Sequence, residues 1–382
     1  MDNSNQFKYE PPVILHPGEF LAEYIDANGW SQRDLARRSG LTPKTVSEIC
    51  NGKAPITPPT SLVLERVLQR PAHFWLNLQR QFDEAEARRR EHSRLEQWAD
   101  WIKKFPMKDM ERYGWLEPEG TKEQKLNALL NFFGVSSPDS WDAVWRATNV
   151  AYRQTRRFRT TPEAVSAWAR AAELEAEQLD FEVQDFDENR LRSLLGKLRN
   201  QTTEPAERFV PTVQELCAGA GVAVVWVPEL PQTGISGCAR WLADNKALVA
   251  LTLRYKTDDQ MWLTFFHEMA HILLHKKHRC FIMDNADQDL ADNVIDPQMQ
   301  REEEEANRFA EDTLVPPSDL HTFIQKSSFS LESIKQFSEK LGIGPGILVG
   351  RLQREEILGY NQGNGLKRKF NWTIGEKDSA AL

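Results

Sequence analysis

The sequence lacks the features of a membrane protein or a disulfide-bonded protein. No apolar run approaches the roughly 20 residues that are needed to cross a bilayer. Residues 1–10 are polar and acidic, whereas a secretory signal has a basic segment followed by an apolar one. Cysteine is scarce, with four residues and no C-x-x-C pair, which excludes a disulfide scaffold and a cysteine-only zinc site. We therefore expect a cytoplasmic protein with no membrane association and reduced thiols. The four cysteines are Cys50, Cys217, Cys238 and Cys280.

An excess of positive charge is also missing. The formal net charge is −8 and the pI is near 5.6, which excludes a protein that binds nucleic acid over its whole surface. A chain of 382 residues is longer than the length that usually folds around one hydrophobic core, so two or three domains are expected. A DNA-binding function would therefore have to reside in one locally basic domain.

Proline, glycine and capping residues predict a series of short helices in the first part of the chain. Pro17 opens a helix that Gly29 ends, which is the usual placement of these two residue types. The stretches 31–40 and 42–52 each begin with a hydroxyl residue that can cap a helix, and each ends with a glycine that can close it. Two more helical stretches follow and complete a predicted five-helix unit.

The second and third predicted helices have the spacing of a helix-turn-helix, in which the second helix of the pair can lie in the major groove of DNA. Arginines and lysines make this stretch locally basic and would meet phosphates. Lys44, Thr45 and Ser47 project away from the inward residues of their helix and are placed for base edges. The predicted DNA-binding residues are Gln32, Arg33, Lys44, Thr45, Ser47 and Lys53. The alternative interpretation is a protein-binding module.

The same segment resembles a known family. The stretches HPGEFL, GWSQRDLARRSGLTPKTVSEICNGK, TPPTSLVLERVL and PAHFWLNLQ lie between His16 and Arg80. They resemble the HigA-type antitoxins within the Cro/repressor helix-turn-helix class. This resemblance implies a homodimer that binds a palindromic operator in double-stranded DNA.

The pattern changes along the rest of the chain. Residues 98–202 stay helical and rich in tryptophan, at spacings that suit packing between helices, and carry no chemical motif. After Pro205, short β-branched or apolar runs at 222–227 and 247–253 are bounded by Gly, Pro and Asp, which predicts strands. A small α+β domain is therefore expected in the C-terminal half.

An apolar stretch at 261–275, MWLTFFHEMAHILLH, contains an H-E-x-x-H motif. Residues four apart lie on the same face of a helix, so His267 and His271 present their rings to one point. Two imidazoles and a third protein ligand suit Zn²⁺ and leave one position for water. Glu268 is the expected general base, which takes the proton of that water as it attacks a peptide carbonyl. Ionisable side chains that merely fill an apolar helix face would be costly, which favours the metal site.

A third ligand is expected from the segment REEEEANRFAEDTLVP at 301–316. Glu302 and Glu303 fall on the inward stripe of this predicted helix, and one of them is the expected ligand. The two glutamates that follow point outward, where the macrodipole at a helix start favours them. His275, one turn beyond the motif, or His278 beyond it, competes as third ligand, although the glycine of the three-histidine zinc pattern is missing.

The motif pair resembles the metallopeptidase family named for the proteins ImmA and IrrE. The pattern consists of H-E-x-x-H, here His267 to His271, and of E-x-E-A-N-x-F-A, here Glu303 to Ala310, followed by a leucine and a proline. The resemblance covers roughly 201–354 and implies one Zn²⁺ per chain, with Glu303 as the third ligand. Asn307 then occupies the position from which a side chain orients a ligand histidine. The usual activity of this family is cleavage of a repressor.

Together these features predict a mainly α protein with four regions. We expect an N-terminal five-helix Cro/repressor-like helix-turn-helix domain at 12–82 and a helical middle region at 83–200. A zincin-like α+β metallopeptidase domain with a small sheet follows at 201–360, and a tail at 361–382. The expected function is a DNA-binding, antitoxin-like regulator whose zinc endopeptidase cleaves a repressor or a toxin partner. The alternative is a non-catalytic repressor whose zinc domain serves as a sensor or dimerisation body, but such a domain has no use for Glu268.

Overall fold

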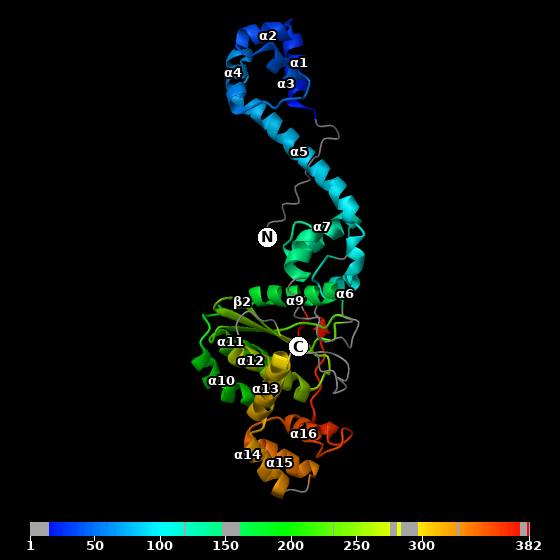
Figure 1. The fold of residues 1–382 in the computed structure, drawn as a ribbon, viewed down its shortest axis with the longest axis vertical. Helices are drawn as coiled ribbons and strands as arrows, with labels where there is room; N and C mark the ends of the chain where they lie inside the picture. The colour runs from blue at the N-terminus through cyan, green and yellow to red at the C-terminus, as the bar shows by residue number, and fades with distance from the viewer. Residues whose placement is uncertain are drawn as a thin grey trace. The chain divides into compact units, whose positions relative to one another are not determined.

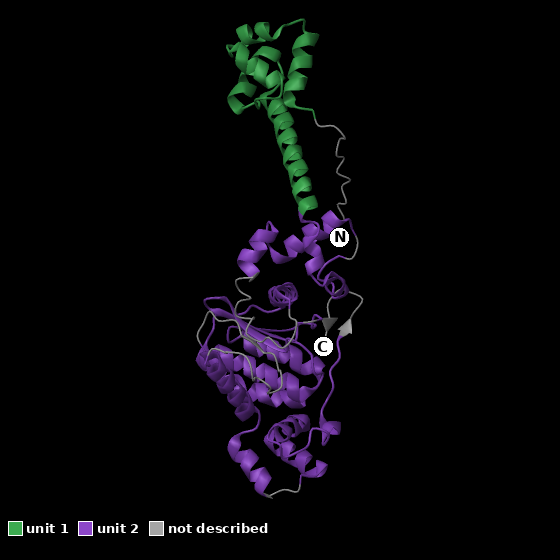
Figure 2. Ribbon diagram, turned by 45° about the vertical axis from the view of Figure 1, so that its right-hand side comes forward, with its two compact units in different colours: residues 1–97 green, residues 98–382 purple. Residues whose placement is uncertain are grey.

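The computed structural model of the protein describes residues 15–117, 120–146, 161–231, 233–275, 281–283, 297–326, 329–374 and 380–381. It divides into two compact units, residues 1–97 and residues 98–382 (Figure 2). The described part is mainly helical, as the sequence predicts. None of its described helices combines the length and the apolar character that crossing a membrane requires.

The first unit contains the predicted five-helix arrangement. Its helices are α1 (Pro17–Ala27), α2 (Gln32–Ser39), α3 (Pro43–Cys50), α4 (Pro58–Leu68) and the first part of α5 (Ala72–Trp98). Ser31 caps α2 and Thr42 caps α3, because each side-chain oxygen accepts a hydrogen bond from the backbone N–H three residues later, at 3.2 and 3.0 Å. Leu35, Val46 and Trp75 have no exposed surface and join these helices in one core.

Helix α5 continues well beyond this core, and most of its length is exposed. Of its 27 residues, only Trp75, Gln79 and Leu95 are buried. Gln79 belongs to the helix-turn-helix core, since its Oε1 accepts a hydrogen bond from the backbone N–H of Ile56 at 2.9 Å. Further along, the side chains form ion pairs along the helix surface, and the later part of α5 is therefore a solvated helix.

The second unit begins with a group of short helices that is rich in aromatic rings. These are η1 (Trp101–Lys104), α6 (Met107–Arg112), α7 (Lys122–Phe133), α8 (Pro138–Trp141), η2 (Asp142–Arg146) and the longer α9 (Pro162–Glu177). Trp101, Phe105 and Trp141 pack edge to face, with ring centroids 4.6 to 5.8 Å apart. Helix α9 contacts the sheet described next, where Trp168 Nε1 donates a hydrogen bond to the carbonyl of Val227 at 3.4 Å.

A small mixed sheet lies at the centre of the C-terminal region. Its strands, in the spatial order β1-β3-β2-β4, are β1 (Val222–Trp226), β3 (Lys246–Leu251), β2 (Gly237–Ala243) and β4 (Phe281–Met283). β1 runs parallel to β3, and β2 runs antiparallel to both β3 and β4. Strand β1 is buried throughout, as expected for a sheet that is covered on both faces. Figure 1 shows α9 on one side of this sheet and α11 (Ala206–Ala218) and α12 (Asp258–Leu274) on the other.

Further helices complete the C-terminal region. They are α10 (Glu188–Asn200), η4 (Gln201–Thr203), α13 (Pro297–Leu314), α14 (Pro317–Lys326), α15 (Leu331–Leu341) and α16 (Pro345–Arg354). Helix α12 lies in the middle of this group and packs against α13, α16 and the strands β2 and β3. Its aromatic residues Trp262, Phe265 and Phe266 have no exposed surface and belong to the main core.

None of the described cysteines forms a disulfide. Cys50, Cys217 and Cys238 are buried, and Cys280 lies outside the described residues. Burial raises the pKa of the Cys50 and Cys217 thiols, so both favour the neutral form. These two residues are core residues rather than metal ligands.

The first part of the segment that the sequence assigns to a tail returns to the core. It contains η5 (Asn364–Leu366), and the short strands β5 (Thr373–Ile374) and β6 (Ala380–Ala381) follow. Phe370 is only 8% exposed and belongs to the main core. The Arg368 side chain donates from Nε to Asp258 Oδ2 at 3.2 Å, and its backbone N–H donates to Asp258 Oδ1 at 3.1 Å. The segment is thus anchored to the first turn of α12, and its polar composition gives no hint of this long-range ion pair.

We predict that Arg368→Ala lowers the free energy of unfolding of the second unit by about 3 kcal/mol, because it leaves the fully buried Asp258 without its partner. The measurement is urea unfolding followed by tryptophan fluorescence. Lys369→Ala, at the exposed neighbouring residue, is the matched control and should change stability by less than about 0.5 kcal/mol. Equal effects of the two substitutions would show that the ion pair does not anchor this segment.

Candidate metal centre

The H-E-x-x-H motif lies on the buried central helix of the second unit. The apolar residues around the motif pack on all sides of α12, so that the motif itself is buried within the fold. His267 and Glu268 have no exposed surface, and His271 is 2% exposed. Side chains that can carry charge are costly at such a position unless they have partners.

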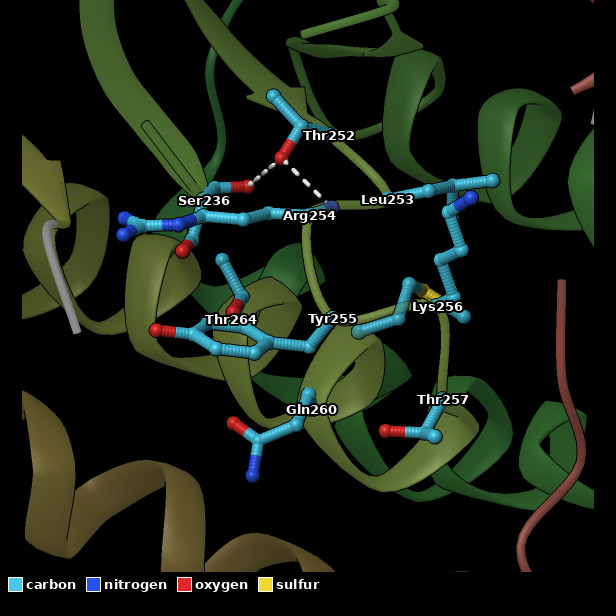
Figure 3. A pocket seen from close by; sticks show the side chains of 10 residues that line it. Ser236, Thr252, Leu253, Arg254, Tyr255, Lys256, Thr257, Gln260 and Thr264 are labelled. Atoms are coloured by element: carbon cyan, nitrogen blue, oxygen red, sulfur yellow. Dashed lines mark hydrogen bonds between the residues drawn. The ribbon is translucent and has the colours of Figure 1, made fainter. Parts of the chain in front are cut away.

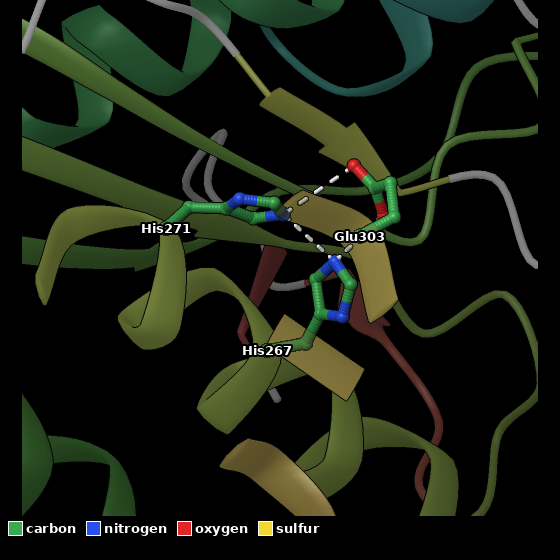
Figure 4. Close-up of side chains that lie close together, drawn as sticks. All are labelled: His267, His271 and Glu303. Atoms are coloured by element: carbon green, nitrogen blue, oxygen red, sulfur yellow. Dashed lines mark hydrogen bonds and ion pairs between the residues drawn. The ribbon is translucent and has the colours of Figure 1, made fainter. Parts of the chain in front are cut away.

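Three side chains converge beside this helix. His267 Nε2 lies 2.9 Å from His271 Nε2. The carboxylate of Glu303, on α13, lies 3.2 Å from His267 Nε2 and 3.5 Å from His271 Nε2 (Figure 4). Tetrahedral ligands about 2.0–2.1 Å from zinc lie roughly 3.3 Å from one another. The donor set and its spacing therefore fit a metal ion, and these residues form a candidate metal-binding group.

The geometry separates the two glutamates that the sequence left as alternatives. Glu303 Oε1 and Oε2 face the two imidazoles, and the side chain is 37% exposed. Glu302 is buried, and its Oε1 accepts a hydrogen bond from Gln298 Nε2 at 3.0 Å. The metal-binding group found in the described residues consists of His267, His271 and Glu303, without Glu302.

Burial and hydrogen bonds keep both histidines suited to bind a cation. Burial, and next the neighbouring His267 and His275, lower the pKa of His271 well below its usual value. His271 is therefore neutral and has a lone pair to offer. Asn307 Oδ1 lies 2.9 Å from His267 Nδ1. When Nδ1–H donates to that oxygen, the lone pair of His267 is on Nε2, which faces Glu303. The structure thus brings Asn307 to the position that the family resemblance implies.

His275 does not join the three converging side chains. Its Nδ1 lies 2.8 Å from Nδ1 of His271, which is the opposite edge of that ring from the candidate metal-binding nitrogen. Its Nε2 lies 3.4 Å from Glu305 Oε2. The sequence raised His275 as a competing ligand, but the spacing along the helix gave no means to tell a ligand from a partner of a ligand. His278, the other competing histidine, lies outside the described residues.

Glycine at the start of β2 makes room for the Glu268 side chain. A Cβ atom on Gly237 would lie 2.8 Å from Glu268 Oε1 and 2.5 Å from Thr264 Cγ2. The backbone of Gly237 and the side chains of Thr264 and Glu268 are therefore closer than any residue larger than glycine would permit. Sequence reasoning missed Gly237, because an isolated glycine near a strand carries no signal until the opposing helix is known.

A small polar cavity lies next to this contact. It has a volume of about 10 Å³, which is room for roughly one water molecule. Thr264, which also abuts Gly237, and Ser236, which precedes it, both line the cavity, as do Arg254 and Tyr255 (Figure 3). Arg254 Nη1 donates to the carbonyl of Gly234, and its guanidinium carbon lies 5.3 Å from the centroid of the Tyr255 ring. The sequence could not place these two side chains.

The predicted DNA-binding residues lie on and around α2 and α3 of the first unit. Their side chains stay outside the helix-turn-helix core. The exposed ones are Arg33, Lys44 and Lys53, and the partly exposed ones are Gln32, Thr45 and Ser47. Lys44 Nζ lies 3.8 Å from Glu48 Oε1, at the distance of a weak surface ion pair. The ends of these helices are fixed by the caps, so the side chains project from a rigid element.

Both parts of the chain match known families. Residues 21–75 match the helix-turn-helix family, and residues 246–353 match the IrrE N-terminal-like domain family of peptidases. The helix-turn-helix match includes α2 and α3, and the peptidase match includes all of the candidate metal-binding residues.

Individual relatives cover the first unit. The chain is 37% identical over 71 residues to an uncharacterized HTH-type transcriptional regulator, YddM, of Escherichia coli strain K12, which covers 19% of this chain and 76% of that protein. It is 39% identical over 77 residues to virulence-associated protein I of Dichelobacter nodosus, over 20% of this chain and 70% of that protein.

Solved structures match the same region. An addiction module antidote protein of the HigA family from Coxiella burnetii shares 33% identity over 22% of this chain and 92% of its own, with a TM-score of 0.21. An antidote protein of a plasmid maintenance system from Nostoc punctiforme shares 30% identity over 22% of this chain and 91% of its own, also with a TM-score of 0.21. The chain belongs to the helix-turn-helix family of DNA-binding regulators, and it carries in addition an IrrE N-terminal-like peptidase domain.

Proposed function

We propose that this protein is an antitoxin-like DNA-binding regulator with a zinc-dependent endopeptidase that cleaves a regulatory protein, either a repressor or a toxin partner. The observation that carries the enzymatic part is the convergence of His267, His271 and Glu303 beside the buried Glu268. We assign the helix-turn-helix domain to 12–82, the helical middle region to 83–200, the peptidase domain to 201–360 and the tail to 361–382. The tail then includes the segment anchored to α12.

His267, His271 and Glu303 would hold the zinc ion. Two neutral imidazoles and one carboxylate are ligands that zinc takes in catalytic sites, whereas structural sites have four protein ligands. A zinc ion held by these residues would lower the pKa of water toward neutrality and would polarise a peptide carbonyl. The family resemblance of Glu303 to Ala310 supports the same ligand set.

Glu268 is the residue to which we assign the proton transfers. It follows a ligand histidine directly on α12, and Gly237 leaves its carboxylate room at the start of β2. The carboxylate takes a proton from the attacking water and gives it to the amine that leaves when the peptide bond breaks. The low exposure of this side chain keeps bulk water from competing for that proton.

The second candidate is a non-catalytic repressor that retains zinc only as part of a sensor or dimerisation body. The helix-turn-helix relatives by themselves favour it, since one of them is named only as a transcriptional regulator. The buried Glu268 speaks against it, because a purely structural zinc site has four protein ligands and needs no additional carboxylate to activate water.

For the first unit we propose a homodimer that binds a palindromic operator in double-stranded DNA inside the cell. Lys44, Thr45 and Ser47 on α3 would read base edges, and Gln32, Arg33 and Lys53 would contact phosphates. The support is the dense match of His16 to Arg80 to HigA-type antitoxins and the exposure of these side chains. A toxin partner follows from the same match.

The Glu268→Gln variant tests the enzymatic proposal. It should bind zinc as tightly as the wild type and lose cleavage by a factor of about 10²–10⁴, because the ligands remain and only the base is removed. Proteomics on cells that produce either form should find protein fragments with new N-termini only with the wild type, and these would identify the substrate. Glu304→Gln, at an exposed residue of α13, is the control. Identical fragments from Glu268→Gln would contradict the proposed mechanism.

Gly237→Ala tests the close contact between β2 and Glu268. We expect a loss of about 1–3 kcal/mol in the free energy of unfolding, because the added methyl group overlaps Thr264 and Glu268. Gly196→Ala is the matched control, since a Cβ there meets nothing within 4 Å and should leave stability unchanged or higher. Thermal denaturation measures both. If Gly237→Ala were as stable as Gly196→Ala, the assigned packing around Glu268 would be incorrect.

For DNA binding, Lys44→Ala combined with Thr45→Ala should lower affinity for a preferred sequence by about 10-fold or more and relax the sequence preference. Lys53→Ala should weaken binding to all sequences alike and reduce the salt dependence by about one charge. The probe is DNA selected from a random pool by the wild-type chain, with affinity measured by fluorescence anisotropy. Arg80→Ala on α5 is the control. No change for the double variant would favour a protein-binding role of α3.

A further inference from the structure

A row of side-chain contacts extends from the candidate metal centre, through the ring edge of His271 that faces away from Glu303, to the protein surface. His271 Nδ1 lies 2.8 Å from His275 Nδ1, and the two ring centroids are 4.9 Å apart. His275 Nε2 lies 3.4 Å from Glu305 Oε2. His275 is the C-cap residue that directly follows α12; its backbone is extended, and its side chain is only 3% exposed. A nearly buried imidazole therefore lies between a candidate ligand and a surface carboxylate.

The hydrogen atoms in this row can be assigned from the contacts. Two ring nitrogens that face each other at hydrogen-bond distance need one proton between them. If His271 Nε2 offers its lone pair to the ion, the proton of that neutral ring is on Nδ1, which donates to His275 Nδ1. His275 then carries its own proton on Nε2, which faces Glu305 Oε2. Each donor meets an acceptor, and the row ends on a glutamate side chain at the surface.

The two candidate ligand histidines therefore have different hydrogen-bond partners at Nδ1. His267 meets the amide oxygen of Asn307, a single neutral acceptor. His271 meets a second imidazole that is itself polarised by a carboxylate. A ligand histidine whose far N–H is held in this way keeps its ring orientation and becomes a better electron donor.

We infer that His275 and Glu305 act as positioning residues for His271, and that they strengthen metal binding without being ligands. The inference rests on the proposed metal centre. His275 contributes most, because it is buried and contacts the ligand ring directly, whereas the Glu305 side chain is 62% exposed and its contact is longer. Removing such a partner of a metal ligand lowers metal affinity by a factor of about 10–100.

The test is the affinity of the full chain for Zn²⁺, measured by competition with a chromophoric chelator. His275→Leu should weaken binding about 10–100-fold. His275→Gln should retain more affinity, because its amide oxygen can accept the same hydrogen bond from His271 Nδ1. Glu305→Ala should weaken binding less than His275→Leu, and Glu304→Ala, at the exposed neighbour that contacts Gln300, should have no effect.

Co²⁺ spectra separate a positioning role from a ligand role. With Co²⁺ in place of zinc, the visible bands of His275→Leu should keep the intensity and number of the wild-type bands, since the ligand set is unchanged. A change in band intensity would indicate the loss of a ligand and would overturn the inference. Wild-type zinc affinity in His275→Leu would also overturn it, and so would equal losses of affinity in the His275→Leu and His275→Gln variants. If the wild type itself binds no Zn²⁺, the proposed metal centre is wrong, and not only the positioning role of His275 and Glu305.

Discussion

The packing of α12 against α13 is the interaction on which the second unit depends. It brings His267 and His271 from one helix to Glu303 of the other, at distances of 3.2 and 3.5 Å. Each helix by itself offers an incomplete set of ligands, and only their contact makes three donors meet. The apolar residues of α12 and the small residues Ala306 and Ala310 of α13 permit this close approach.

The residues around this contact stabilise the buried ionisable side chains of α12. Burial removes water from the motif and drives the imidazole of His271 toward its neutral form, which is the form that binds a cation. Asn307 and His275 satisfy the ring nitrogens that do not face Glu303. At the other end of α12, Arg368 neutralises the buried Asp258, so the C-terminal segment also helps to fix the motif helix.

The sequence predicts local features of this protein well and long-range ones poorly. The spacing of His267 and His271 and the caps of the helix-turn-helix depend only on nearby residues. The helices that they predict, α12, α2 and α3, are confirmed. Periodicity narrowed the third donor on this helix to two adjacent glutamates, and the family resemblance implied Glu303. The orientation of α13 brings Glu303, and not Glu302, to the two histidines. The glycine that faces Glu268 and the return of Phe370 to the core involve contacts between distant segments, which no local pattern encodes.

The most direct measurement of the proposed centre is X-ray absorption at the zinc edge on the purified full-length chain. The account predicts about one zinc per chain, with a nitrogen and oxygen ligand shell, scattering from two imidazoles and no sulfur neighbour. Replacement of Glu303 by Ala should remove one oxygen neighbour and weaken binding. A chain that copurifies with no metal and takes up none, or a spectrum dominated by sulfur ligands, would contradict it.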